Sequence, residues 1–297
     1  MLHIISNEPQ CLICNNKLNK KNKSFPYSTE FENNKFNYYC CKQCHSVTIN
    51  PIPSKKLLEK IYNQDEYYEK FYSDENNQEY IQSINFLKKK IKGKNCSILD
   101  FGCGNGHFIK ILKEQNFKIQ GVEFSKEQAH YLTNKLNTIV YEYQEFLEKT
   151  DLKYDVIHLG DVLEHLTNPA DILQHIKKNL NKNGLLYIEG PLERNPSFVF
   201  FTISIFSFFK SFFKENNHVP YHLSFTNQKA QILFFNNLGL KISYWNIYET
   251  GWPYNNSKNI FKKLIAGLSV FLSKIPFLCN IIGNRFRTFL YIDSIQK

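Results

Sequence analysis

The sequence lacks the marks of a secreted or membrane-spanning protein. Residues 1–10 contain no basic start followed by an apolar core, so we expect no cleavable signal peptide. The longest apolar run, 197–213, is interrupted by Lys210 before it reaches the roughly twenty residues that a membrane crossing needs. These absences predict a cytoplasmic protein.

The composition excludes a disordered chain but leaves the partners open. Hydrophobic residues make up 42% and charged residues 22% of the 297 positions, which is ordinary for a globular protein. This length suits one α/β core with an appended module. The formal charge of +10 fits nucleic acid, an anionic membrane surface or a phosphorylated substrate. Because much of it comes from lysines scattered among asparagines, a solvated surface is the simpler interpretation.

The cysteines fall in a pattern that predicts a metal site. In a reducing compartment, paired thiols serve metal binding or redox chemistry more often than disulfides. Cys11 and Cys14 form one C-x-x-C pair and Cys41 and Cys44 another, with 26 residues between them, which resembles a zinc ribbon. Four thiolates at about 2.3 Å close the coordination shell of Zn²⁺, so such a site is structural and supplies folding energy. Cys40 is an extra thiol, and a set of unligated cysteines is the alternative.

Three alternate glycines form the most informative stretch of the chain. Gly102, Gly104 and Gly106 follow an apolar run that contains Asp100. Glycines permit positive φ and remove side chains, so the backbone can press against a ligand before the next helix starts. About twenty residues further on, Glu123 ends a second apolar segment, where a carboxylate can take both hydroxyls of a ribose. Together these features predict a nucleotide-cradling loop between a strand and a helix.

The loop and the later carboxylate resemble motif I and the acidic residue of strand two in class I S-adenosylmethionine-dependent methyltransferases. The resemblance covers roughly residues 11–250 and the last strand. It implies an α/β fold with a Rossmann-like seven-stranded sheet, and S-adenosyl-L-methionine as the cofactor. Asp100 matches the acid of the first strand, the three glycines match the loop, and Glu123 matches the ribose-binding acid. By position we add Phe101, Phe124 as a stacking partner of the adenine, Gln144 or its neighbour Tyr143 at the base, and Asp161.

The elements of this fold can be followed along the sequence. We expect a zinc-ribbon module at 1–53, a helical linker at 54–92 that Ser54 caps, and the methyltransferase domain at 93–297. Helical insertions are expected near 197–215 and 256–285. The predicted strands start at Ser97 and continue with 118–123, 139–141, 155–159, 184–189 after a turn at 181–184, and the closing antiparallel pair 240–247 and 288–292.

Asp161, Glu164 and His165 follow the fourth predicted strand, where the transferred methyl group would lie. One interpretation is that they cap and polarise the next helix. In a second, His165 is a general base toward a substrate hydroxyl. In a third, the resemblance to quinone O-methyltransferases implies that all three bind a divalent cation, although Asp at 161 shortens the reach of the usual Glu. Glu164 and His165 are therefore predicted catalytic residues.

A second polar cluster follows the fifth predicted strand, where substrate-contacting segments of this fold lie. Tyr221 and His222 are the predicted acceptor contacts, and His222 is the third catalytic candidate. Alternatively, Ser224 or Thr226 starts a helix over 227–237 and the histidine is structural.

The two insertions are apolar enough to suggest a surface contact. Phenylalanines in 197–213 occupy nearly every side of a helix, and such a helix is either buried or lies against something apolar. The segment 258–274 adds lysines beside large apolar residues. This pattern predicts peripheral contact with the inner face of the membrane, which suits a lipid-linked sugar or a quinone. A lid over the active site and a dimer interface are the alternatives.

The sequence thus predicts a methyltransferase that acts on a small molecule. A cysteine pair, an Asn-Pro turn, a helix and then Tyr67 and Tyr68 resemble a subgroup associated with surface-glycan and small-molecule biosynthesis. A nucleotide- or lipid-linked sugar is the preferred acceptor. The alternatives are an RNA base methyltransferase, a quinone-type O-methyltransferase at the membrane surface, and a non-catalytic partner-binding protein. Nucleic acid is disfavoured because the ribbon region shows no concentrated arginines or aromatic platform.

Overall fold

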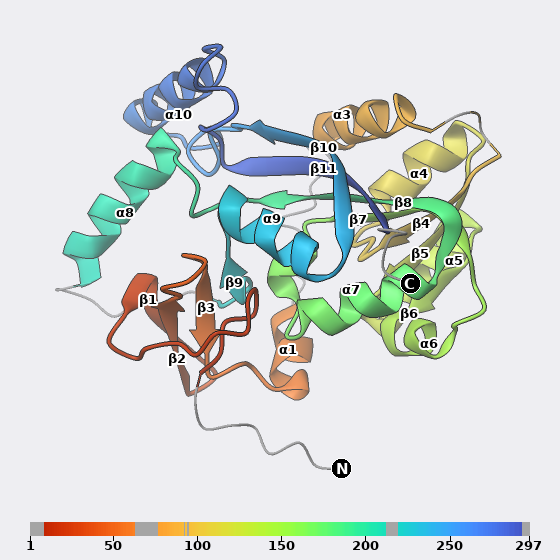
Figure 1. The fold of residues 1–297 in the computed structure, drawn as a ribbon, viewed down its shortest axis with the longest axis horizontal. Helices are drawn as coiled ribbons and strands as arrows, with labels where there is room; N and C mark the ends of the chain where they lie inside the picture. Colours follow the sequence, from red (N-terminus) through yellow and green to blue (C-terminus); the bar gives the residue numbers. More distant parts are fainter. Residues whose placement is uncertain (1–8, 63–76, 92, 94, 212–218, 293–297) are drawn as a thin grey trace.

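The protein is built around a seven-stranded sheet with the strand order β10-β11-β8-β7-β4-β5-β6 (Figure 1). The computed structural model describes residues 9–62, 77–91, 93, 95–211 and 219–292, with the backbone alone for 77 and 207–211. The strands of this sheet are β4 (Ser97–Phe101), β5 (Lys118–Glu123), β6 (Val140–Glu142), β7 (Tyr154–Gly160), β8 (Leu180–Pro191), β10 (Leu240–Tyr248) and β11 (Arg285–Ile292). All pairings from β6 to β8 are parallel, and β11 is antiparallel to both β8 and β10. The predicted seven-stranded α/β fold is confirmed.

Helices cover both faces of this sheet because its central strands are apolar on both sides, as parallel strands usually are. Along β4, Leu99 and Phe101 enter one core and Ile98 the other. The first core contains residues of α7 (Pro169–Lys178) and α9 (Gln228–Asn237). The second contains residues of α3 (Asn77–Lys88), α4 (His107–Glu114) and α5 (Lys126–Leu136).

The strand order brings the predicted site residues to one edge of the sheet. Asp100, Glu123 and Asp161 lie at or just after the carboxyl ends of β4, β5 and β7, and β4 pairs with both of the other strands. Ligands of open α/β sheets bind at this edge, at the point where the order of the strands reverses. The reversal falls between β4 and β7, so this edge is the place to look for a site.

The amino-terminal ribbon forms a second, four-stranded sheet of β1 (Lys23–Phe31), β2 (Asn34–Cys40), β3 (Val47–Asn50) and β9 (Ser224–Phe225). Its last strand comes from the segment that follows β8, more than 170 residues after β3. Helix α1 (Lys55–Tyr62) packs on this sheet through Leu57, Leu58 and Ile61, and Leu57 N donates to Ser54 Oγ as expected. The boundary at residue 53 stays a prediction, and Tyr67 and Tyr68 lie outside the described residues.

Three local expectations are wrong. Asn227, not Ser224 or Thr226, caps α9, because its side chain accepts from Ala230 N at 2.9 Å while Ser224 lies in β9. Helix α7 is capped by Asn168, so Asp161 to His165 are too far upstream to cap it and instead form a turn with the short 3₁₀ helix η2 (Leu163–His165). The turn expected at 181–184 is a register shift inside β8, which starts pairing at Leu180.

The two insertions are helical. Helix α8 (Phe198–Ser211) lies between α10 (Ile260–Ser273) and strand β1 of the ribbon (Figure 1). A short helix, α6 (Tyr143–Glu148), follows β6. None of the helices in the described part of the chain has both the length and the apolar character of a membrane-spanning segment.

Candidate functional site

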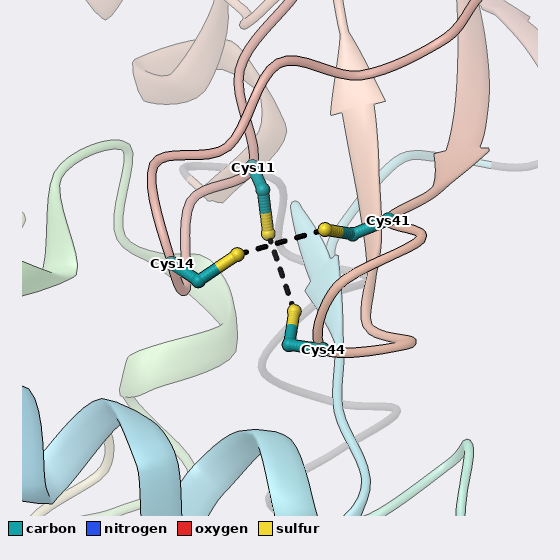
Figure 2. A group of neighbouring side chains, drawn as sticks. All are labelled: Cys11, Cys14, Cys41 and Cys44. Carbon is teal, nitrogen blue, oxygen red and sulfur yellow. Dashed lines mark hydrogen bonds between the residues drawn. The ribbon is translucent and has the colours of Figure 1, made fainter.

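The four predicted cysteines converge at one point (Figure 2). The sulfur atoms of Cys11, Cys14, Cys41 and Cys44 all lie within 4.8 Å of one another. Cys11 and Cys44 are 3.6 Å apart, and Cys14 and Cys41 are 3.5 Å apart. The extra thiol of Cys40 points instead toward the carbonyls of Cys41 and His45. Four converging sulfurs are the donor set of a structural zinc site, so the cluster is suited to hold Zn²⁺.

The two cysteine pairs sit in loops of the same construction. Cys11 N donates to Asn16 O and Asn15 N to Cys11 O, and the second loop repeats both bonds with Cys41, His45 and Ser46. The residue after each second cysteine, Asn15 or His45, has a φ near +60°. Hydrogen bonds also reach the sulfurs themselves: Ser46 Oγ lies 3.2 Å from Cys11 Sγ and 3.0 Å from Cys44 Sγ. Donors of this kind orient thiolates around a metal.

Glu123 occupies the position predicted for the ribose acid. The residue is 7% exposed, and its carboxylate accepts from Gly104 N at 2.8 Å and from Phe124 N at 2.8 Å. Burial raises the pKa of Glu123 to about 7. The loop that it contacts has positive φ at Gly102, Gly104 and Gly106. The Glu123 carboxylate lies at the end of β5 and against a loop of glycines. In this position it can accept hydrogen bonds from the two ribose hydroxyls of an adenosyl group.

The other predicted cofactor contacts differ in what they can offer. Phe101 has its side chain in the core against Phe146, so only its main chain can meet a ligand. The rings of Phe101 and Phe124 both contact Tyr143, with centroids 6.1 and 5.8 Å away. Gln144 is exposed at the start of α6. The aromatic neighbour Tyr143 is therefore better placed than Gln144 to border a base, and both assignments stay predictions.

Asp100 belongs to a buried network of charged side chains that was not predicted from the sequence. Its Oδ1 lies 2.7 Å from Nδ1 of His158, whose Nε2 is 3.3 Å from Glu189. Glu189 also accepts from Arg287 Nε at 2.6 Å, and His158 stacks on Phe108 with the ring centroids 4.0 Å apart. Both ring nitrogens of His158 face carboxylates, so the imidazolium is the form that fits. The network balances two carboxylates with two cations, and contact of Asp100 with the cofactor stays a prediction.

This network predicts a specific dependence of stability on pH. Burial disfavours a charged His158, but its hydrogen bonds to Asp100 and Glu189 outweigh burial and raise its pKa to about 9. Because folding raises the pKa of His158, the charged ring contributes stability that is fully present below its unfolded pKa near 6.5. This stability is lost as the pH rises through the folded pKa of about 9. We expect His158 alone to lower the free energy of unfolding in urea by up to about 3 kcal/mol between pH 6.5 and 9.5, in addition to the changes from other titrating groups. In His158→Phe the fall should be smaller than in the wild type by about this amount; an equal fall in this variant would contradict the assignment.

Glu164, His165 and His222 form a second cluster. One ring nitrogen of each histidine and a carboxylate oxygen of Glu164 lie within 4.8 Å of one another. The Nδ1–H group of His165 donates to Tyr221 O at 2.8 Å, so in the neutral ring Nε2 carries the free lone pair. His222 Nδ1 lies 2.6 Å from Glu193 Oε1. The structure thus brings together the three residues predicted to be catalytic, from segments on either side of β8.

The environment gives the two histidines different charges. Burial lowers the pKa of His165 to about 3, so its imidazole is neutral. Burial also disfavours a charged His222, but the hydrogen bond to Glu193 outweighs it and raises the pKa to about 9. Burial, followed by the charge of Asp161, raises the pKa of Glu164 to about 8. A neutral imidazole and a charged imidazolium therefore lie next to each other, so one can accept a hydrogen bond and the other can donate one.

Asp161 does not belong to this cluster. Its two carboxylate oxygens each accept from Arg285 Nη2 at 2.7 Å, and the side chain is about half exposed. In this structure Arg285 of β11 pairs with Asp161, and His222 rather than Asp161 lies beside Glu164 and His165; the grouping of Asp161 with them as cation ligands stays a prediction. Contact of Asp161 with the cofactor stays a prediction.

Aromatic contacts connect the two halves of the site. Tyr62 of α1 has its hydroxyl 3.1 Å from His165 Nδ1 and donates to Tyr221 O at 2.9 Å. Its ring lies 5.5 Å from that of His165 and 6.1 Å from that of Phe124, next to Glu123. The residue after the predicted ribose acid and the predicted catalytic cluster thus lie on either side of Tyr62.

Several residues of the site were not foreseen. Five residues that were not assigned to the site from the sequence contact the predicted residues or interact with their charges: Tyr62, Tyr80, His158, Glu189 and Glu193. Burial raises the pKa of Tyr80, and the charges of Asp100 and Asp161 raise it further. His158 and Glu189 interrupt apolar strands, and a lone polar residue inside such a strand was an available signal.

Comparison with known proteins places the chain in a family. A model of the Methyltransferase domain family, Methyltransf_23, matches residues 72–259, which is 188 of the 297 residues. The chain therefore belongs to this methyltransferase family. Among solved structures, a SAM-dependent methyltransferase from Archaeoglobus fulgidus superposes with a TM-score of 0.50 at 17% identity, over 75% of this chain and 97% of that one. The plantazolicin methyltransferase BamL gives 0.51 at 14% identity, over 80% and 94%. The predicted class I methyltransferase fold is confirmed.

The relatives in sequence are named for different acceptors. The chain is 28% identical over 188 residues to the tRNA U34 carboxymethyltransferase of Campylobacter lari, covering 58% of this chain and 60% of the relative. It is 33% identical over 103 residues to the ubiquinone biosynthesis O-methyltransferase of Glaesserella parasuis, covering 31% and 43%. The chain thus spans about three fifths or less of the length of these curated relatives.

Proposed function

We propose that this protein transfers a methyl group from S-adenosyl-L-methionine to a hydroxyl of a small-molecule acceptor. The observation that carries the proposal is the buried carboxylate of Glu123 on the N–H of Gly104, in a segment whose next residue, Phe124, is linked through Tyr62 to a neutral His165. Bound S-adenosyl-L-methionine would supply an electrophilic methyl group. The glycine loop and Glu123 would hold its adenosyl part.

His165 would act on the acceptor. Its Nε2 lone pair can accept a hydrogen bond from the acceptor hydroxyl and take its proton as the oxygen gains the methyl group. His222, charged and held by Glu193, can donate to the same oxygen and stabilise negative charge there. Tyr62 and the carbonyl of Tyr221 fix the ring of His165, so that its lone pair faces the site. Positioning of this kind supplies much of the catalysis in a displacement reaction.

A divalent cation is a second use of the same cluster. Glu164, His165 and His222 offer one oxygen and two nitrogens, and each histidine has its other nitrogen bonded to a carbonyl or a carboxylate, as metal-binding histidines usually do. These residues fit a cation that would polarise the acceptor oxygen. If turnover survives a chelator that leaves the ribbon zinc in place, the cation has no part and His165 acts as the base.

The acceptor class is best approached through three alternatives. A sugar hydroxyl, carried on a nucleotide or a lipid, fits a base directed at an aliphatic alcohol. A quinone-type phenol is favoured by the relative named for ubiquinone biosynthesis. RNA is favoured by the relative named for tRNA and by the net charge of +10. Transfer of a labelled methyl group to each acceptor in turn separates them, and salt-dependent RNA binding would favour the third.

The Glu123 assignment predicts a large loss of cofactor affinity. Replacing Glu123 by Ala removes two charge-assisted hydrogen bonds to the ribose, so S-adenosylhomocysteine should bind roughly 100-fold more weakly in calorimetry. Glu123→Gln, which keeps an acceptor oxygen, should recover part of the affinity. Glu127→Gln, at an exposed position of α5, is the matched control. Unchanged affinity in a folded Glu123→Ala protein would place the cofactor elsewhere.

A further inference from the structure

Helix α10 buries its small side chains and exposes its large apolar ones. Ala266 and Ser269 are 4% and 0% exposed, and Ser269 Oγ donates to Glu249 Oε2 at 3.1 Å. Gly251 approaches so closely that a Cβ there would lie 2.9 Å from Ala266 Cβ. On the rest of the helix, five large apolar side chains are 45% to 72% exposed: Ile260, Phe261, Leu264, Leu268 and Phe271. Helices on the surface of a globular protein normally bury such residues.

The exposed apolar surface continues beyond α10. Helix α8 packs against α10 through Val199, which is buried with Tyr254 and Ala266. Phe201 and Phe206 of α8 are 60% and 66% exposed, and Phe277, after the end of α10, is 75% exposed. Figure 1 shows the two helices together at one end of the sheet. Clustered large apolar side chains of this kind mark an interaction surface.

The same part of the chain carries charge of one sign. From 250 to 292 the sequence contains no Asp or Glu, and its basic residues are Lys258, Lys262, Lys263, Lys274, Arg285 and Arg287. All four lysines are exposed and flank the apolar residues of α10. Residues 197–214 likewise contain two lysines and no acid. A partner that fits this surface must therefore offer an apolar layer to the large side chains and negatively charged groups to the lysines beside them.

We propose that α10 and the adjoining exposed residues of α8 dock on an anionic phospholipid bilayer. Large apolar side chains beside lysines are the composition of helices that lie in the plane of a membrane interface. Phe261, Leu264, Leu268 and Phe271 would enter the boundary between headgroups and acyl chains, and the lysines would contact lipid phosphates. A second copy of the chain is disfavoured, because it would bring the same positive charge against itself.

This docking does not require methyl transfer, although it would bring a lipid-linked acceptor to the protein. The probe is a set of vesicles of phosphatidylcholine alone or mixed equally with phosphatidylglycerol, and the readout is co-flotation of the zinc-loaded full chain. Flotation is expected with the anionic vesicles, with little or none on the neutral ones. High salt should weaken it at least about 10-fold, because the charge attraction is screened.

Two paired variants and one control test the surface itself. Phe261→Ser with Leu264→Ser, and separately Lys262→Glu with Lys263→Glu, should each weaken partitioning at least about 10-fold. Lys110→Glu with Lys135→Glu makes the same change of charge on exposed positions of α4 and α5 and should leave partitioning close to wild type. Absence of flotation with anionic vesicles, or equal losses in the control, would overturn the proposal.

The remaining outcomes assign the surface to another occupant or separate the two proposals. A dimer in analytical ultracentrifugation that Leu264→Ser disrupts, without flotation of the wild type, would give this surface to a second copy and overturn the lipid proposal. Calorimetry with S-adenosylhomocysteine on the same variants should match the wild type. Absence of flotation by the wild-type chain, with intact cofactor binding, would contradict this inference and leave the proposed function standing.

Discussion

Replacing His165 by Asn is expected to lower kcat by about 10²- to 10⁴-fold, the usual contribution of a general base. The asparagine amide can still donate to Tyr221 O in place of Nδ1, so the local fold is kept. It removes the Nε2 lone pair that accepts the acceptor proton. Because, among the described residues, the ring is linked to Phe124 through Tyr62 and not directly, affinity for S-adenosylhomocysteine should stay close to that of the wild type.

Two comparisons make this result specific. His130→Asn, on the exposed side of α5, should leave kcat unchanged. His222→Asn should also lower kcat, because it removes the charged donor that Glu193 holds in place. Full turnover in His165→Asn with a hydroxyl acceptor would show that the proton leaves by another route.

Loss of the ribbon metal is expected to stop turnover without dismantling the seven-stranded sheet. Hydrogen bonds connect the ribbon that carries the cysteine cluster to the segment that contains Glu164. Asn227 Nδ2 donates to Cys44 O, Ile49 N donates to Leu223 O, and Leu223 N donates to Glu164 O at 2.7 Å. Structural zinc contributes about 10 to 16 kcal/mol in zinc-finger peptides, so the loops do not hold their shape without it. Displacement of His222 by about 1 Å would cost about 100-fold in rate.

Cys44→Ser is the direct test, and Cys40→Ser is its matched control. The first should lose bound zinc, measured by elemental analysis, and lose turnover at least about 100-fold, while the heat of S-adenosylhomocysteine binding persists. The second removes a neighbouring thiol that points away from the cluster and should change neither zinc content nor rate. A zinc-free protein with normal turnover would show that the ribbon has no part in shaping the site.

The sequence was most informative where function is carried by the backbone. Alternate glycines at 102, 104 and 106 all adopt positive φ, and the acid at 123 reaches the loop, because strand and loop geometry follow from local residue types. The C-x-x-C spacing likewise specified the four-sulfur cluster and left Cys40 outside it. Strand existence followed from apolar runs, while the caps at Asn168 and Asn227 were missed because neighbouring polar residues compete for that position.

The remaining features depend on contacts between segments far apart in sequence. Nothing near Asp161 indicates that Arg285, 124 residues later, takes its carboxylate. The pairing of His222 with Glu193 and the return of β9 to the ribbon depend on how the chain crosses the molecule after β8. Glu164, His165 and His222 were therefore predicted as single residues, and their assembly into one cluster required the structure.

The central claim is that the glycine loop and Glu123 hold the adenosyl group of the cofactor, and a crystal structure of the zinc-loaded chain with S-adenosylhomocysteine tests it most directly. The account predicts density for the ribose at the carboxyl end of β5, with its two hydroxyls on the Glu123 carboxylate and the sulfur directed toward His165. A structure in which the ligand lies elsewhere, while Glu123 keeps its bonds to Gly104 and Phe124 and a protein side chain fills the space, would contradict it.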